Sequence, residues 1–227
     1  LLILCSKVEG EVGMKINIVI PSTVLGGGVR VLFLYSNYLV QNGHDVVIYV
    51  PMLAYSNQRG KPNIKTSIAN TFKRRTVVNW FDCQFKIKLA PAIKDIFIRD
   101  ADITIASAWY TAPDVFDLSA SKGKKIYFIQ DYEIWNQNKE IVDATYKLDM
   151  NRIVITKSLQ KLLNKNFGVD STVIYNGHHN DEYLDEEKVI NNRKCIIMLC
   201  NTANYKGGWS GIEILKKLYK KYGVRII

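Results

Sequence analysis

Two short segments of this chain carry the residue types best suited to chemistry: the glycine triplet Gly26-Gly27-Gly28 and the acidic segment from Asp131 to Glu133. Because glycine has no Cβ, the triplet lets the backbone turn sharply and lets a ligand approach the amides of a following helix. A helix N-terminus gathers unpaired N–H groups and partial positive charge, which suit phosphate or another anion. The triplet therefore predicts a binding site for a phosphorylated or strongly polar ligand.

The acidic segment follows an apolar run, residues 125–130, that we expect to be a buried strand. In parallel α/β sheets, ligands bind outside the carboxyl ends of the strands. Asp131 or Glu133 could there orient an acceptor hydroxyl or accept its proton. Either carboxylate could equally cap the following helix or pair with a surface lysine. Gln130, the last residue of the run, is a candidate for the same site.

Two familiar phosphate-binding loops do not fit the glycine triplet. A dinucleotide fingerprint needs a third glycine where this chain has Val31, and an acid at the end of the second strand, which here ends Tyr49-Val50-Pro51. A nucleoside-triphosphate P-loop needs Gly-Lys-Ser or Gly-Lys-Thr, and this chain has Gly28-Val29-Arg30. Both interpretations are excluded.

Composition sets the broad class of the protein. The 227 residues, 48% of them apolar, are enough for one large core or two modest ones. Lys and Arg outnumber Asp and Glu by 31 to 21, and the net charge of +10 favours nucleic acid, phospholipid or a phosphorylated small molecule as partner. Solvated lysine-rich faces explain the charge equally well. The four cysteines form no Cys-x-x-Cys pair, which argues against disulfides and structural zinc and indicates a cytoplasmic protein.

The elements that must position these residues alternate between strand and helix patterns. The predicted strands are residues 15–21, 45–50, 77–89 (as one or two short pieces), 103–106, 125–130, 152–156 and 171–175. The predicted helices are residues 29–42, 64–75, 93–100, 112–120, 137–148 and 158–167. This alternation predicts an α/β fold with a doubly wound parallel sheet.

The pattern changes near residue 180. Residues 180–193 are polar and acid-rich and predict a linker, whereas 194–227 predict a further strand, helix and strand. We therefore expect a first domain over 14–179 and the truncated start of a second, similar domain. Residues 1–13 precede Met14, and we expect them to be a non-native or loose extension.

Four pieces of sequence carry a resemblance to a known family. They are residues 14–30 with 39–46, residues 173–177, the pair Lys206-Gly207, and residues 128–133. In this order and spacing they resemble a GT-B glycosyltransferase, most closely the family 4 of retaining enzymes that use nucleotide sugars. The piece at 128–133 is similar to a bacterial subgroup that makes rhamnose-containing and similar surface polysaccharides. The resemblance covers residues 14–227, meaning the acceptor-side domain and the beginning of the donor-side domain.

The resemblance implies an enzyme that moves a sugar from a nucleotide-diphosphate sugar to a glycan or lipid-linked acceptor, with retention, in cell-surface polysaccharide synthesis. It implies no metal and no other cofactor. It assigns Lys206 and Gly207 to the donor diphosphate and places the glycine triplet at the cleft. The family's donor-binding glutamate pair belongs to a later part of the second domain, so we expect this chain alone to be inactive.

One departure from the family concerns the segment after the fourth strand. Many members carry a histidine there, where this chain has Ser107-Ala108-Trp109-Tyr110. Trp109 could line the acceptor site by stacking on a sugar ring, or it could fill the core.

Two alternatives stay open. A GT-B nucleotide-sugar epimerase would share the fold, and a non-catalytic module could bind nucleic acid or anionic lipid through the positive charge. Aromatic residues do not interleave with basic ones on one predicted strand face, so we do not expect nucleic acid as a partner. Lysines of the last helix could instead contact an anionic membrane at the inner face of the cell. They are Lys216, Lys217, Lys220 and Lys221.

Overall fold

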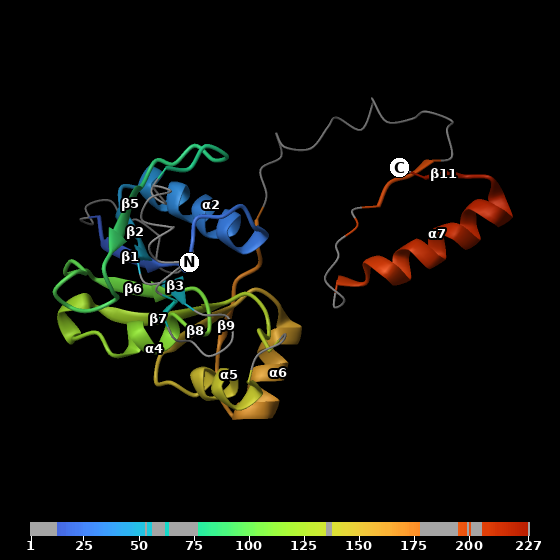
Figure 1. Cartoon of the computed structure of the whole chain (residues 1–227). Coiled ribbons are helices and arrows are strands. Elements are labelled where there is room, and N and C mark those ends of the chain that lie inside the picture. The colour runs from blue at the N-terminus through green and yellow to red at the C-terminus, as the bar shows by residue number, and fades with distance from the viewer. Residues whose placement is uncertain are drawn as a thin grey trace. The chain divides into compact units, whose positions relative to one another are not determined.

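The computed structural model describes residues 13–52, 54–55, 62–63, 77–134, 138–177, 195–198, 200 and 206–226. The chain forms two compact units, residues 1–177 and 178–227, which are taken one at a time below (Figure 1). The predicted helix at 64–75, the predicted linker at 180–193 and nearly all of the expected extension at 1–13 lie outside the described residues.

The first unit is built on a seven-stranded parallel sheet with the order β5-β2-β1-β6-β7-β8-β9. Its strands are β1 (Lys15–Val19), β2 (Asp45–Pro51), β5 (Lys86–Ala90), β6 (Ile103–Ala106), β7 (Lys124–Ile129), β8 (Asn151–Val154) and β9 (Thr172–Val173). From β1 the chain first winds outward to β5, and then from β6 it winds the other way to β9. This reversal between β1 and β6 is the doubly wound arrangement that the sequence predicted. A separate antiparallel pair joins β3 (Ala54–Tyr55) to β4 (Pro62–Asn63).

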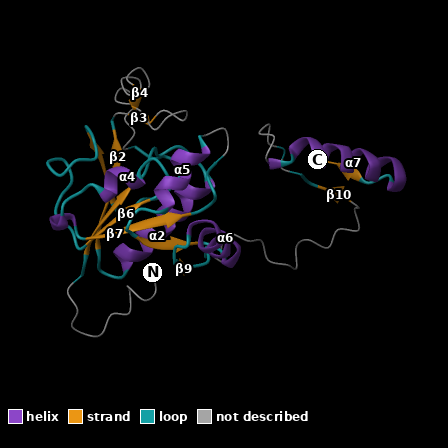
Figure 2. Ribbon diagram, turned by 90° about the horizontal axis from the view of Figure 1, so that it is seen from below, coloured by secondary structure: helices purple, strands orange, loops and turns teal. Residues whose placement is uncertain are grey.

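Helices cover both faces of this sheet, so its central strands are apolar on both sides. Helix α2 (Gly27–Gln41) packs against one face through buried residues one turn apart, Leu32, Phe33, Ser36 and Leu39. Helices α4 (Ala112–Phe116), α5 (Lys139–Tyr146) and α6 (Lys157–Phe167) pack against the other face. Figure 1 shows the two helix layers, and Figure 2 gives the view from below.

The ends of these helices follow local sequence rules. The Asn138 side chain caps α5 by accepting from the N–H groups of Glu140 and Ile141, and the Thr156 hydroxyl caps α6. Gly168 ends α6 in the left-handed conformation with φ of 67°, which favours glycine. These caps explain why both helices were found close to their predicted positions.

Three predicted elements differ from the structure. Residues 93–100 form turns rather than a helix, because the buried Ile93 and Ile98 are five residues apart and Ile96 between them is 83% exposed. The helix from Ala112 ends at Phe116, and residues 120–122 form a short 3-10 helix instead. The stretch predicted as extended, residues 77–89, contains only one strand, β5, which covers residues 86–90. In the residues before this strand, three aromatic rings pack around Phe33 with centroid distances of 5.1 to 5.4 Å. They belong to Trp80, Phe81 and Phe85.

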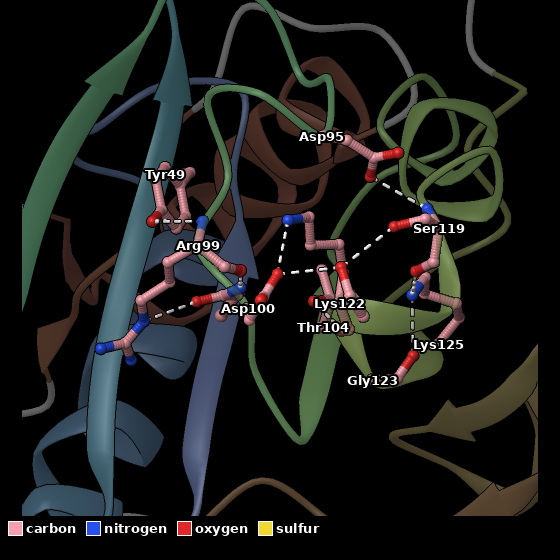
Figure 3. Close-up of polar contacts among 11 residues, drawn as sticks. Tyr49, Asp95, Arg99, Asp100, Thr104, Ser119, Lys122, Gly123 and Lys125 are labelled. Atoms are coloured by element: carbon pink, nitrogen blue, oxygen red, sulfur yellow. Dashed lines mark hydrogen bonds and ion pairs between the residues drawn. The ribbon is translucent and has the colours of Figure 1, made fainter.

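Two charged networks lie where the strands begin (Figure 3). The Arg99 guanidinium donates to the Asn17 side-chain oxygen at 3.0 Å and pairs with Asp45 at 2.5 Å, and this contact holds the pKa of Asp45 below its usual value. The Lys122 ammonium, almost buried, pairs with Asp100 at 2.7 Å. These four charged side chains pair with one another within the fold. We therefore interpret the two networks as contacts that stabilise the structure.

The second unit contains a parallel pair of strands, β10 (Cys195–Ile196) and β11 (Arg225–Ile226), connected through helix α7 (Gly208–Tyr222). This is the strand, helix and strand predicted for residues 194–227. Gly207 precedes α7 with φ of 68° and Gly223 follows it with φ of 61°, and both values lie in the left-handed region that glycine tolerates.

Candidate functional site

The candidate site lies at the carboxyl ends of β1, β6 and β7, next to the reversal of strand order. Segments leaving these strands carry every residue of the first unit that the sequence singled out. The segment after β1 leads to the glycine triplet, the segment after β6 contains Trp109, and the segment after β7 contains the acidic residues. Open α/β sheets bind their ligands at this kind of position.

The glycine triplet starts helix α2 rather than forming a sharp turn. Gly26 is extended with φ of −164°, and Gly27 and Gly28 are the first two helical residues, so none of the three lies in the left-handed region. Gly26 and Gly27 are exposed and Gly28 is half-buried. Gly26 has no side chain with which to cap the helix, and the first turn contains no acidic residue. This N-terminus is therefore open and favourable to an anion.

Gln130 connects the end of β7 to this helix start. Its side-chain Nε2 donates to the Gly28 carbonyl oxygen at 3.2 Å. A Cβ on residue 28 would lie 3.0 Å from Nε2 and 3.3 Å from Oε1 of Gln130. A Cβ at position 28 would therefore require the Gln130 amide to shift by a few tenths of an ångström. The sequence assigned both residues to the site and did not predict that they touch.

Glu133 is the acidic side chain with the properties of a general base. It is half-buried, and its Oε2 accepts from the Trp109 backbone N–H at 2.9 Å. Burial raises the pKa of Glu133 to about 7; the Asp131 charge adds to this effect and the N–H of Trp109 opposes it. Near neutral pH the carboxyl therefore exists in both protonation states, as a group that takes up and releases protons requires.

Asp131 behaves differently from its neighbour. It is exposed, and its Oδ1 accepts from the Tyr132 N–H at 2.7 Å, a local turn contact. This contact of Asp131 is local, and the catalytic roles of Asp131 and Glu133 stay predictions. Asp131 still acts on Glu133 by raising its pKa.

Trp109 is a core residue in this structure. Its side chain is 5% exposed and contacts Tyr110 edge to face, with ring centroids 5.2 Å apart. The indole packs in the core, which favours the core-filling interpretation, and an acceptor-lining role for this ring stays a prediction. What Trp109 contributes to the site is its backbone N–H.

Two tyrosines that the sequence did not single out surround Glu133. Its backbone N–H donates to the Tyr146 hydroxyl at 3.1 Å, and burial together with Glu133 raises the pKa of Tyr110 to about 12. Tyr146 belongs to α5 and Tyr110 to the segment after β6. No local sequence pattern indicates that either lies next to Glu133.

Lys206 and Gly207 belong to the second unit. Lys206 is exposed and stands directly before Gly207, the left-handed residue that precedes α7. Both are therefore at the start of a helix, as the triplet is in the first unit. Their contact with a donor diphosphate stays a prediction.

In the ranges that the structure describes, no group of three or more His, Cys, Asp and Glu side chains is arranged to hold a metal ion. The expectation that the reaction needs no metal or other cofactor stays a prediction. Within the same ranges, no helix combines the length and the hydropathy that crossing a bilayer requires.

Comparison with known proteins gives a match to a family model and matches to solved structures. Residues 57–159 match a family model described as WsaF, N-terminal domain. The structure is similar to that of an alpha-glucosyltransferase solved in complex with UDP and a 13-mer DNA containing an HMU base, with a TM-score of 0.50 and 13% sequence identity. The similarity covers 92% of this chain and 54% of the glucosyltransferase, so this chain spans about half the length of that protein. No curated protein sequence matches the chain.

The family match covers only part of the candidate site. The WsaF-like stretch contains Trp109, Gln130, Asp131, Glu133 and Tyr146, whereas the glycine triplet and Lys206 lie outside it. At 13% identity the likeness to the glucosyltransferase shows the fold, an α/β Rossmann-like fold of the GT-B kind, as the sequence predicted.

Proposed function

We propose that this protein is a glycosyltransferase, or part of one, that moves a sugar from a nucleotide-diphosphate sugar to a glycan or lipid-linked acceptor. The observation that carries the proposal is the half-buried Glu133 carboxyl, with a pKa near 7, at the carboxyl end of β7. Gln130 of the same segment contacts the open start of α2, which suits the charged part of such a donor. The WsaF-like stretch and the GT-B-like fold are consistent with this chemistry.

In the proposed reaction the bond between the anomeric carbon and the donor phosphate breaks, and a bond forms from an acceptor oxygen to that carbon. The N–H groups at the start of α2 stabilise the negative charge of the departing diphosphate. Glu133 orients the acceptor hydroxyl and accepts its proton. Following the resemblance to family 4, we propose that the anomeric configuration is retained and that the product belongs to a cell-surface polysaccharide.

Product analysis tests this function. Protein made from the complete open reading frame that encodes this chain is incubated with labelled nucleotide sugars, with and without glycan or lipid-linked acceptors. Transfer predicts a labelled product that forms only with acceptor and releases a nucleoside diphosphate. A changed sugar on an intact nucleotide, formed without acceptor, would instead identify the epimerase. Failure of every donor to react in either way would contradict both enzyme readings.

Helix α7 supports a proposed contact with an anionic membrane, which would bring a lipid-linked acceptor to the enzyme. Its four exposed lysines share one side of the helix with Trp209, which is 67% exposed, and tryptophan is enriched at membrane interfaces. Each basic residue near an anionic surface contributes about 1 kcal/mol. Flotation with anionic vesicles should therefore carry the protein upward at low salt, and uncharged vesicles should not. Equal behaviour with both vesicle types would contradict the contact.

Nucleic acid is the competing partner for the same positive charge. The glucosyltransferase of similar fold was solved with a DNA, and this chain has a net charge of +10. Contacts made only with phosphates weaken steeply with salt. Binding to DNA or RNA that persists at about 0.3 M salt would favour a nucleic-acid acceptor over the glycan or lipid-linked one.

A further inference from the structure

Tyr146 is the last residue of α5 and lies in the core directly beneath the acidic segment. Its side chain is fully buried. The ring stacks on Tyr127 with centroids 5.8 Å apart and planes 9° apart, and on Phe167 at 5.5 Å. Rings held on two sides in this way have one position available, so the hydroxyl has a fixed place as well.

That hydroxyl contacts the main chain of the acidic segment twice. It accepts from the Glu133 N–H at 3.1 Å and donates to the Asp131 carbonyl oxygen at 3.4 Å. The two contacts lie on either side of Tyr132 and fix the path of the chain there. Because the Glu133 side chain starts from this path, the same contacts determine whether its Oε2 can reach the Trp109 N–H.

A second contact ties the same segment to α5. The Tyr132 hydroxyl donates to Asp143 Oδ1 at 2.7 Å, and Asp143 also pairs with Lys139 one turn earlier. Helix α5 therefore holds the acidic segment from two successive turns, through Asp143 and Tyr146. Side chains that fix a reactive group in this manner hold it in the geometry that the reaction needs.

We propose that Tyr146 is a positioning residue, which holds the backbone of residues 131–133 so that the Glu133 carboxyl stays between the Trp109 N–H and the acceptor. Its effect on catalysis rests on the proposed glycosyltransferase function, whereas its effect on the position of Glu133 does not. Removing the hydroxyl leaves the Glu133 N–H without its partner, and the segment moves toward water to replace that bond.

The test uses Tyr146→Phe, which keeps the ring and removes the hydroxyl. Tyr49→Phe is the matched control, because Tyr49 is also almost fully buried and its hydroxyl also accepts from a backbone N–H, that of Arg99, at 3.2 Å. That contact lies in the structural network where the strands begin (Figure 3). Both substitutions remove a hydrogen bond from a main-chain N–H, and Tyr146→Phe also removes the longer contact with the Asp131 carbonyl oxygen. A merely structural effect would therefore appear in both variants.

The first measurement needs no substrate. Carbon-13 NMR of labelled glutamate carboxyls gives the titration of Glu133, whose signal is identified by its loss in Glu133→Gln. Charged and titratable groups that act on Glu133 are Asp131, Tyr110, Tyr127 and Tyr146. The pKa values of the three tyrosines are raised by burial, so these side chains stay neutral below pH 9.

In Tyr146→Phe we expect the pKa of Glu133 to fall by about one unit or more, because the freed carboxyl becomes hydrated. Amide hydrogen exchange at Trp109 should become at least about tenfold faster as its acceptor moves away. Tyr49→Phe should leave both values as in the wild type. Unchanged values in Tyr146→Phe, or equal changes in both variants, would overturn the proposal. Should Tyr146→Phe not fold, Tyr132→Phe must show the same two changes in smaller measure, and their absence would overturn it as well.

The second measurement uses the transfer reaction. In Tyr146→Phe we expect kcat to fall at least about tenfold while the KM for the donor changes less than about twofold, since misplacing a reacting group by about 1 Å can cost about 10²-fold. A wild-type protein without transfer activity would contradict the proposed function alone, and the titration would still decide the role of Tyr146.

Discussion

The Gln130 side chain lies against the backbone of Gly28, with Nε2 donating to the Gly28 carbonyl oxygen at 3.2 Å. Gln130 follows strand β7 in the chain, and Gly28 lies in the helix that follows strand β1. Strand β6 lies between these two strands in the sheet. Their contact joins the acidic segment to the open start of α2, so that carboxylates and a helix N-terminus favourable to an anion lie at one edge of the sheet. This arrangement suits a reaction in which a hydroxyl loses its proton while a diphosphate leaves.

Substituting Gly28 should weaken the contact between Gln130 and the start of α2. A methyl group in Gly28→Ala lies 3.0 Å from Gln130 Nε2, so the Gln130 amide must shift by a few tenths of an ångström. Gly27→Ala is the control, because a Cβ there meets nothing within 4 Å. We expect Gly27→Ala to raise the free energy of unfolding by up to about 1 kcal/mol through helix propensity, and Gly28→Ala to gain less. Donor affinity, measured by calorimetry, should fall only in Gly28→Ala; equal affinities in the two variants would contradict a role for the Gly28–Gln130 contact.

Stability should depend on pH through Glu133. Its folded pKa of about 7 is above that of an exposed glutamate, so the folded protein holds the proton more tightly than the unfolded chain. The contribution of Glu133 to stability is thus complete below about pH 4.5 and is lost as pH rises through 7. At about 1.4 kcal/mol per pKa unit, we expect a loss of roughly 2–3 kcal/mol between pH 5 and pH 8 in urea unfolding.

The variant Glu133→Gln isolates this effect, because it has no carboxyl to titrate. Its stability should fall less between pH 5 and pH 8 than that of the wild type. Substitution of the exposed Glu140 by Gln should leave the wild-type slope unchanged. A wild type and a Glu133→Gln variant with the same slope would show that the carboxyl titrates as an ordinary exposed one.

Trp109 and Trp209 should respond to substitution in opposite ways. Trp109→Ala removes a large buried side chain from the core, and such changes cost about 3–5 kcal/mol. Trp209→Ala removes a ring that is 67% exposed, and surface changes of this kind stay within about 0.5 kcal/mol. Chemical unfolding of the two variants measures both effects. A small loss in Trp109→Ala would mean that the indole is available to a ligand after all.

The sequence predicted the parts of the fold that local patterns determine. Apolar runs such as residues 103–106 and 125–130 can be recognised as buried strands, and the Asn138 and Gly168 caps mark the ends of helices. Residues 93–100 were predicted wrongly because their apolar residues have helical spacing while only some of them are buried. The burial of each residue there depends on strands and loops far away in the sequence, which no local pattern reveals.

The candidate site was predicted only as a set of separate residues. The position of Glu133 and Gln130 after a strand follows from the pattern, and their place at the binding edge follows from the parallel sheet. Contacts across the fold do not follow, including those of Glu133 with the Trp109 N–H and the Tyr146 hydroxyl. The exposed or buried state of Trp109 was likewise open, because the sequence context of a core tryptophan and a stacking tryptophan can be the same.

The kcat of sugar transfer by Glu133→Gln tests the central claim most directly, with the exposed Glu140→Gln as its control. General-base groups contribute about 10²- to 10⁴-fold to a rate. We therefore expect Glu133→Gln to lower kcat by at least about 10²-fold and Glu140→Gln to stay within about twofold of the wild type. A Glu133→Gln variant that transfers sugar at the wild-type rate would contradict the claim that this carboxyl takes the acceptor proton.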